Sequence, residues 1–103
     1  MEYSRKYYGN AILDENEVED KTIIELDYFK TKENGNYGLE IIKKVFKDNI
    51  RTNEVIQLPK VTNSEALIDD LLSKIHKYKV TPVSLSDVIN DYFYSLNQFS
   101  FKN

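Results

Sequence analysis

The stretch KTIIELDYFKTKENGNYGLEIIKKVFK (residues 21–47) decides the fold expected for this chain of 103 residues. Apolar and polar residues alternate in 21–30 and again in 36–47. Alternation with a period of two is typical of strands that bury one face. Asn34-Gly35 between the two runs is the strongest short signal for a hairpin turn. The stretch therefore predicts two adjacent antiparallel strands.

Two further strands are expected around this hairpin. Residues 2–13 are rich in aromatic and β-forming side chains, and residues 53–58 give a shorter strand after a polar turn at 47–49. Pro59 is expected to end that strand, because proline cannot donate to the hydrogen-bond ladder. Connections this short favour an antiparallel meander, since parallel strands need a crossover of a dozen residues.

The last third of the chain has the spacing of amphipathic helices. Thr62 and Glu65 are expected to cap the first helix, and Ser84 and Asp87 the second. Pro82 predicts the break between the helices, because proline is poorly tolerated in a helix interior. The apolar stripe of the first helix consists of Ile68, Leu71, Leu72 and Ile75.

Together these elements predict a single α+β domain over residues 1–103. A four-stranded antiparallel meander (1–61) is followed by two C-terminal helices packed on one face (62–98) and by a tail (99–103). The sequence does not decide which sheet face the helices cover. Two helices cannot cover both faces, so one face and an edge strand are expected to stay open to a partner.

Composition excludes several classes of function. The net charge of −3 has the wrong sign for a default binder of nucleic acid or anionic membranes. The absence of cysteine excludes disulfides, thiolate nucleophiles, iron–sulfur clusters and cysteine-ligated zinc. The N-terminal residues lack the apolar core of a signal peptide, and no apolar run is long enough to span a membrane. We therefore expect a cytoplasmic protein.

The chain has no recognisable catalytic motif. His76 is the single histidine, and no carboxylate or nucleophile is adjacent to it in the sequence. It is expected at a helix end, on the surface or at its boundary. Three glycines leave no phosphate-binding loop and no dinucleotide motif. We expect no catalytic residues, no cofactor and no metal site, and a small enzyme of unknown reaction is only the third hypothesis.

The segment DENEVED (14–20) contains five carboxylates. Asp14, Asn16, Asp20 and Glu25 fall at positions one, three, seven and twelve of a calcium-binding loop. The glycine required at position six is missing, and the flanking residues predict strands instead of helices. A solvated hairpin loop is the favoured interpretation, and a weak site for a divalent ion is the alternative.

The aromatic residues motivate the first functional hypothesis. Eight tyrosines and five phenylalanines exceed what a small core needs, and tyrosine is enriched at protein interfaces. We expect a non-catalytic protein-interaction or regulatory module, binding another protein or forming a homodimer through the sheet. The expected contact residues are Tyr3, Tyr7, Tyr8, and Tyr28 or Phe29.

The alternative hypothesis is binding of RNA or single-stranded nucleic acid. A sheet of basic and aromatic side chains can stack bases and neutralise phosphates. The residues expected to do so are Lys43, Lys44, Lys47 and Arg51.

Two segments, YGLEIIKK (37–44) and VTPVSLSDVINDY (80–92), together resemble a family of short uncharacterised proteins from low-GC Gram-positive, spore-forming bacteria. In that family a tyrosine-glycine-hydrophobic-glutamate strand precedes a valine-threonine-proline-valine element and an acidic helix. The resemblance covers most of the chain in layout and two short motifs in detail. It implies a domain of unknown function and brings no activity with it.

Overall fold

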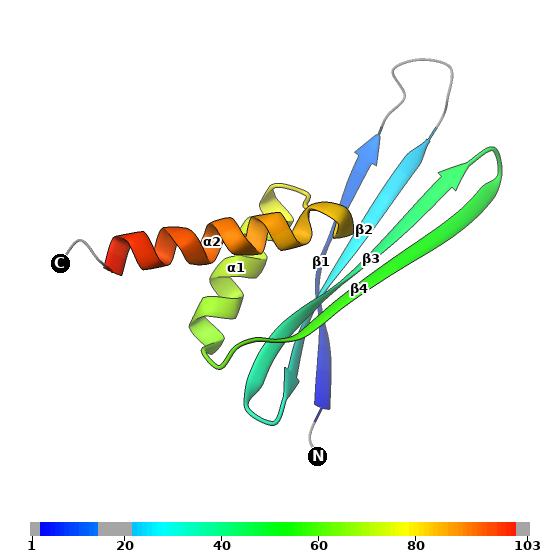
Figure 1. The fold of residues 1–103 in the computed structure, drawn as a ribbon. Coiled ribbons are helices and arrows are strands. Elements are labelled where there is room, and N and C mark those ends of the chain that lie inside the picture. The colour runs from blue at the N-terminus through cyan, green and yellow to red at the C-terminus, as the bar shows by residue number, and fades with distance from the viewer. Residues whose placement is uncertain (1–2, 15–21, 101–103) are drawn as a thin grey trace.

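A computed structural model describes residues 3–14 and 22–100 of the chain. Four strands form one antiparallel sheet in the order β1-β2-β3-β4, and two helices follow (Figure 1). The predicted α+β meander with two C-terminal helices is confirmed. The elements are β1 (Tyr3–Asp14), β2 (Ile23–Glu33), β3 (Asn36–Lys47), β4 (Ile50–Thr62), α1 (Glu65–Lys77), a 3₁₀ turn η1 (Pro82–Ser84) and α2 (Leu85–Ser100).

Two tight turns set the register of the central strands. Asn34 and Gly35 have φ values of 50° and 82°, and Asp48 and Asn49 have φ values of 52° and 64°. Positive φ at both central residues is typical of the type I′ turn, which matches the twist of paired strands. The hairpin predicted at Asn34-Gly35 is confirmed. Apart from Asp14, the acidic segment 14–20 lies outside the described residues.

β4 is longer than the sequence predicted. It continues through Pro59 to Thr62. β4 is an edge strand, where a missing N–H is tolerated. The pairing with β3 is also irregular there, because Tyr37 lies opposite Thr62 while Leu39 lies opposite Leu58. The prediction that Pro59 ends the strand was therefore wrong.

Gly38 makes room for this irregularity. A Cβ atom on Gly38 would lie 2.6 Å from Cα of Pro59 and would overlap the carbonyl oxygen of Leu58. Only glycine lets the two backbones approach this closely. The close approach of β3 and β4 thus explains why the YGLEIIKK segment has glycine at position 38.

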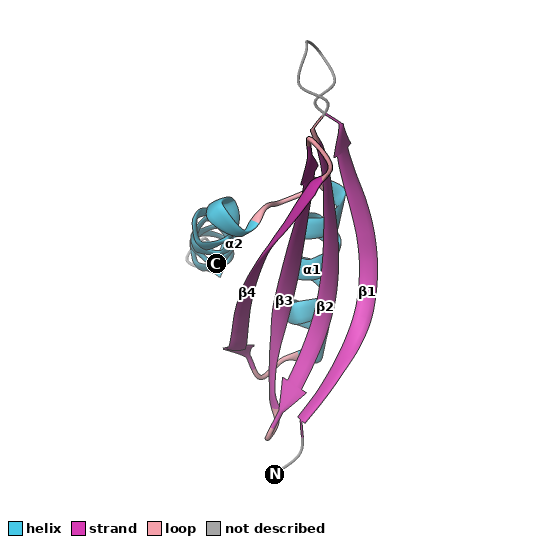
Figure 2. Ribbon diagram, turned by 90° about the vertical axis from the view of Figure 1, so that its right-hand side faces the viewer, coloured by secondary structure: helices cyan, strands magenta, loops and turns pink. Residues whose placement is uncertain are grey.

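The core lies between one face of the sheet and α1. Figure 2 shows α1 behind the sheet and α2 beside β4. All four residues of the predicted apolar stripe on α1 are fully buried. The buried cluster consists of Ala11, Leu26, Tyr28, Leu39, Ile41, Ile68, Leu71, Leu72, Ile75, Val80 and Leu85.

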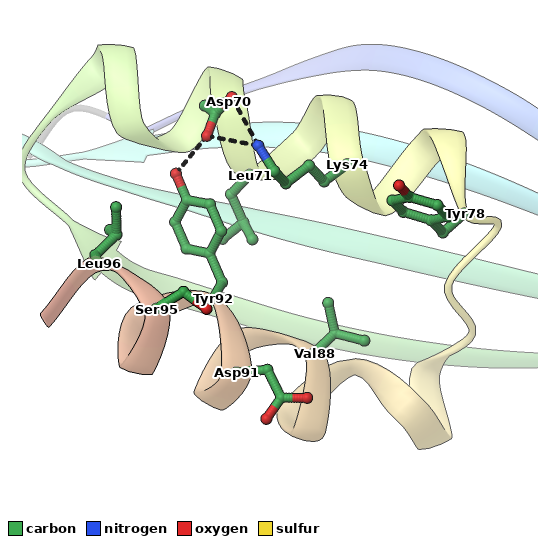
Figure 3. A pocket seen from close by; sticks show the side chains of 9 residues that line it. All are labelled: Asp70, Leu71, Lys74, Tyr78, Val88, Asp91, Tyr92, Ser95 and Leu96. Carbon is green, nitrogen blue, oxygen red and sulfur yellow. Dashed lines mark hydrogen bonds and ion pairs between the residues drawn. The ribbon is translucent and has the colours of Figure 1, made fainter. Parts of the chain in front are cut away.

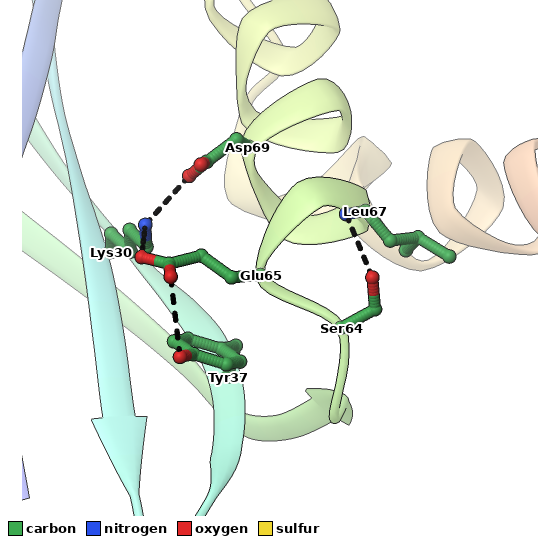
Figure 4. Close-up of polar contacts among 6 residues, drawn as sticks. All are labelled: Lys30, Tyr37, Ser64, Glu65, Leu67 and Asp69. Carbon is green, nitrogen blue, oxygen red and sulfur yellow. Dashed lines mark hydrogen bonds and ion pairs between the residues drawn. The ribbon is translucent and has the colours of Figure 1, made fainter.

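The first turn of α1 is capped by Ser64. Its side-chain oxygen accepts a hydrogen bond from the backbone N–H of Leu67 at 3.2 Å (Figure 4). The predicted cap, Thr62, lies two residues too early, and its hydroxyl instead accepts from the N–H of Ser64. The expected capping box of Thr62 and Glu65 was therefore wrong, and the side chain of Glu65 is directed to the sheet.

Lys30 of β2 joins the N-terminal end of α1 to the sheet. Its Nζ lies 2.7 Å from Glu65 and 2.7 Å from Asp69 (Figure 4). Partial burial lowers the pKa of Lys30, but the hydrogen bonds and charges of Asp69 and Glu65 outweigh it and raise the pKa overall. The hydrogen bond from Lys30 lowers the pKa of Glu65.

Tyr28 joins the other end of α1 to the sheet. Its hydroxyl donates to the carbonyl oxygen of Val80 at 2.8 Å, and burial raises the pKa of Tyr28, which keeps the hydroxyl a donor. The helix ends in a Schellman motif: Val80 N–H bonds to Ile75 and Lys79 N–H to His76. Lys79 occupies the left-handed position usually taken by glycine, with φ 54°.

The start of α2 differs from the prediction. The chain enters the helix through η1, with Thr81 as its N-cap and Pro82 at the first position, where proline is favoured. Ser84 lies inside this turn, and its N–H donates to the carbonyl of Thr81 at 3.1 Å. Ser84 and Asp87 therefore do not form the expected capping box, although the predicted break at Pro82 is confirmed.

Replacing Gly38 by Ala tests the close approach of β3 and β4. The added methyl group meets backbone atoms of β4, which can move away only if the strand itself shifts. We therefore expect the free energy of unfolding to fall by roughly 1–3 kcal/mol. The control is Gly35→Asn, because Gly35 has no neighbour within 4 Å of an added Cβ and asparagine tolerates positive φ. Equal urea midpoints for the two variants would contradict this explanation.

Candidate interaction surface

A groove of about 460 Å³ runs between α1 and α2 (Figure 3). Its wall on α2 is built by Val88, Tyr92 and Leu96, which recur every four residues and so share one helix face. Leu71 of α1 lies at its base (Figure 3). The remaining lining residues are Asp70, Lys74, Tyr78, Asp91 and Ser95.

One hydrogen bond joins the two helices across this groove, and an ion pair within α1 supports it. The hydroxyl of Tyr92 donates to Asp70 at 2.7 Å, and Lys74 Nζ lies 3.1 Å from the same carboxylate (Figure 3). The hydrogen bond from Tyr92, and then that from Lys74, lowers the pKa of Asp70. Partial burial and the bond to Asp70 raise the pKa of Tyr92 to about 12.

A second groove, of about 410 Å³, lies on the other side of α2. It is lined by Leu58, Pro59, Lys60, Val61, Ile89 and Phe93. Val88, Ile89, Tyr92 and Phe93 are only partly buried, so the chain itself does not cover the apolar surface of α2 completely. Toward the C-terminal end of the helix Leu96 is 37% exposed and Tyr94 is 64% exposed.

The charges on and beside α2 are unbalanced. Asp87 and Asp91 are the only charged residues in the sequence of α2. Within the described part of the chain neither has an ion-pair partner, and Lys60 has none either. Figure 3 shows Lys74 on α1 and Asp91 on α2 at opposite rims of the groove.

The expected contact tyrosines are divided among three environments. Tyr3 and Tyr7 are more than half exposed, and they lie on the sheet face away from the helices. Phe29 lies on that face too, with its ring 5.6 Å from that of Tyr7. Tyr8 is partly exposed on the bulge of β1, beside His76. Tyr28 is fully buried, so it is not available to a partner, and Phe29 is partly buried.

The charges of the open face are largely satisfied among themselves. Arg5 bonds to the buried carboxylate of Glu40 at 2.6 Å, and this bond raises the pKa of Arg5. The guanidinium also lies 3.6 Å from the ring centre of Phe29. Lys44 lies 3.0 Å from Asp27. This face offers fewer free groups than the sequence suggested.

The basic residues of the nucleic-acid hypothesis do not form one surface. Lys43 and Lys44 are neighbours on β3 and point to opposite faces, as alternation requires. Lys43 approaches Glu54 at 3.9 Å. Arg51 lies opposite Phe46, on the same face as Lys44. Lys47 shares the face of Lys43 by the same alternation.

His76 lies at the boundary of the core, at the helix end where the sequence placed it. Its Nε2 is 2.8 Å from the carbonyl oxygen of Asn10, and its ring meets those of Tyr8 and Tyr28 edge-on. Across residues 3–14 and 22–100, no three metal-ligating side chains lie close enough to hold an ion. No helix in the same ranges is long and apolar enough to cross a membrane.

Comparison with protein families identifies the family of this chain. The model of a family of unknown function, DUF6514, matches residues 12–95. The chain belongs to this family. The match contains both segments of the expected resemblance, 37–44 and 80–92, so the predicted domain of unknown function is confirmed, while the bacterial group stays a prediction. No curated protein and no solved structure matches the chain significantly.

Replacing Tyr92 by Phe tests the bridge between the helices. At neutral pH we expect the free energy of unfolding to fall by roughly 0.5–1.5 kcal/mol, a modest value because the bond is exposed to solvent. The raised pKa of Tyr92 makes its contribution complete below pH 10 and lost as the pH rises through about 12. The lowered pKa of Asp70 makes its share complete at neutral pH and lost as the pH falls through the folded value.

Urea unfolding of wild type and Tyr92→Phe at a series of pH values provides the measurement. The difference in stability between the two proteins should shrink above pH 10 and again in acid. Tyr94→Phe is the control, because Tyr94 lies on the same helix outside the groove. A difference that does not change with pH would contradict the role given to the bond.

Proposed function

We propose that the chain is a non-catalytic protein-interaction module that pairs with a second copy of itself through the groove between α1 and α2. The observation that carries this proposal is the incompletely covered apolar surface of α2, with a groove on each side. Apolar residues on a surface helix are normally buried on one stripe by the rest of the domain. A helix that leaves part of its stripe open is suited to burying it against a partner.

The shape of the groove supports a pair of chains whose α2 helices run parallel to each other. Val88, Tyr92 and Leu96 form one row, and the 16 residues of α2 extend over roughly 24 Å. A two-fold axis along the groove would set this row beside the same row of the partner and bring the two Tyr92 rings together. The same surface then serves both copies, as a two-fold interface requires.

The charges support a second copy as the partner. Lys74 and Asp91 lie on opposite rims, so a two-fold axis along the groove would place Lys74 beside the partner's Asp91, and Asp91 beside the partner's Lys74. Unlike charges brought together in this way fix the register of an interface. A module of this kind acts through what it binds, which is consistent with a regulatory role. None of the observed contacts favours nucleic acid as the partner.

Light scattering on a size-exclusion column tests the pairing. At high micromolar concentration we expect a mass twice the 12.1 kDa of one chain. Leu96→Lys should weaken the dimer at least tenfold, because it places a charge in the apolar row. Tyr94→Lys changes the charge of the same helix outside the groove and should leave the dimer intact. A strict monomer, or equal effects of the two variants, would overturn the proposal.

A charge exchange tests the register. Asp91→Lys alone sets lysine against the partner's Lys74, and Lys74→Glu alone sets glutamate against the partner's Asp91, so each variant should dimerise poorly. A mixture of the two variants should form a mixed dimer, because both contacts are then attractive. If mixing does not restore the dimer, the two-fold arrangement is incorrect.

A further inference from the structure

The two edge strands of the sheet, β1 and β4, differ in how well they are protected from pairing with a further strand. On β1 the pairing is interrupted by a bulge between Tyr7 and Gly9. The carbonyl oxygens of Asn10 and Ile12 are engaged by His76 Nε2 at 2.8 Å and Lys79 Nζ at 3.4 Å. Bulges and occupied backbone groups are the devices that keep a further strand from adding to an edge. The lone histidine thus protects β1.

β4 has none of these devices over residues 50–57. Its pairing with β3 is unbroken from Ile50 to Leu58. Residues 50–55 and 57 are exposed, and no described side chain bonds to the backbone of 50–57. The segment contains no lysine and no proline. An exposed regular edge of this length is a template for strand addition, because its outer N–H and C=O groups lack protein partners.

α2 and Pro59 limit the free edge of β4 only at its C-terminal end. The second groove places Ile89 and Phe93 of α2 beside residues 58–61. The remaining eight residues, 50–57, are longer than a typical strand of five or six residues. They are therefore long enough to pair with a full added strand.

We infer that the outer edge of β4, residues 50–57, is a docking site for an extended segment of another protein, which adds to the sheet as a fifth strand. Backbone hydrogen bonds supply affinity in this mode, and side chains beside the edge supply specificity. The edge does not depend on the groove between the helices, so this site and the proposed dimer can fail separately.

The side chains of the edge define the occupant. Glu54 is 59% exposed, and its ion pair with Lys43 is long, at 3.9 Å. Most of its charge is therefore available on the face that carries the helices. Arg51, on the opposite face, has no acidic partner among the described residues. The matching segment has lysine or arginine opposite Glu54, an acidic residue near Arg51 and an apolar residue beside Val55, since unlike and apolar cross-strand pairs stabilise sheets.

A second copy of the chain is a poorer occupant of this edge. Pairing through both the groove and β4 would join dimers into longer assemblies, because two separate two-fold interfaces on one chain extend it in two directions. Discrete pairing with a different protein leaves the proposed dimer closed.

Amide exchange measured by NMR on the full chain tests the site. The probe is an acetylated nine-residue peptide of alternating threonine and valine with lysine at its centre. At about 1 mM peptide, a concentration suited to weak binding, we expect exchange at residues 50–57 to slow at least tenfold. Exchange at residues 5–12 of β1 should not change. A control peptide with methylated alternate backbone nitrogens should have no effect, because it lacks the donors for the edge.

A charge exchange distinguishes specific docking from non-specific binding of the peptide. Glu54→Lys should weaken binding of the lysine peptide about fivefold, and a peptide with glutamate at its centre should regain that loss. Glu54 is exposed, so the variant is expected to fold, and Arg51→Glu offers a second variant. Repeating the titration on Leu96→Lys, which is expected to be monomeric, should give the same result.

Four results would overturn the inference. They are no slowing at 50–57, equal slowing with the methylated peptide, slowing at β1 instead, and elongated assemblies of the chain alone that are abolished by Glu54→Lys.

Discussion

The hydrogen bond from Tyr28 to the carbonyl of Val80 fixes where α1 ends over the sheet. A buried hydroxyl left without a partner costs roughly 1–3 kcal/mol, so the chain has a strong reason to keep this contact. Lys30 fixes the other end of the helix through Glu65 and Asp69. With α1 held across the middle of one face, α2 has room only beside α1 and β4. The two grooves and the open face are consequences of that placement.

Much of the fold could be predicted because its signals are local. Asn34-Gly35 specifies a turn by backbone conformation alone, and the spacing of apolar residues on α1 specifies a buried stripe. The caps could not be predicted, because Thr62 and Ser64 are both good capping residues and only the path of the chain selects Ser64. Pro59 could not be interpreted either, since proline ends a central strand but is tolerated on an edge strand.

The candidate surfaces depend on contacts between distant elements, so the sequence indicated them only in part. Alternation on β2 separates Tyr28 from Phe29 but does not say which of them faces the helices. One signal for the groove was present: α2 carries two apolar rows, one with Val88 and Tyr92 and one with Ile89 and Phe93. That is more apolar surface than a single helix contact buries. The protection of β1 by His76 could not be foreseen, because 66 residues separate it from Asn10.

We propose different tasks for the two helices: α1 completes the core, and α2 offers its partly exposed apolar side chains to a partner. Native-state amide exchange at two protein concentrations tests this most directly. In dilute solution, amides of α2 should exchange roughly ten- to a hundredfold faster than the slowest amides of α1, because few buried contacts hold α2 in place. At high concentration only α2 and the facing residues of α1 should slow. Protection of α2 equal to that of α1 at both concentrations would contradict the account.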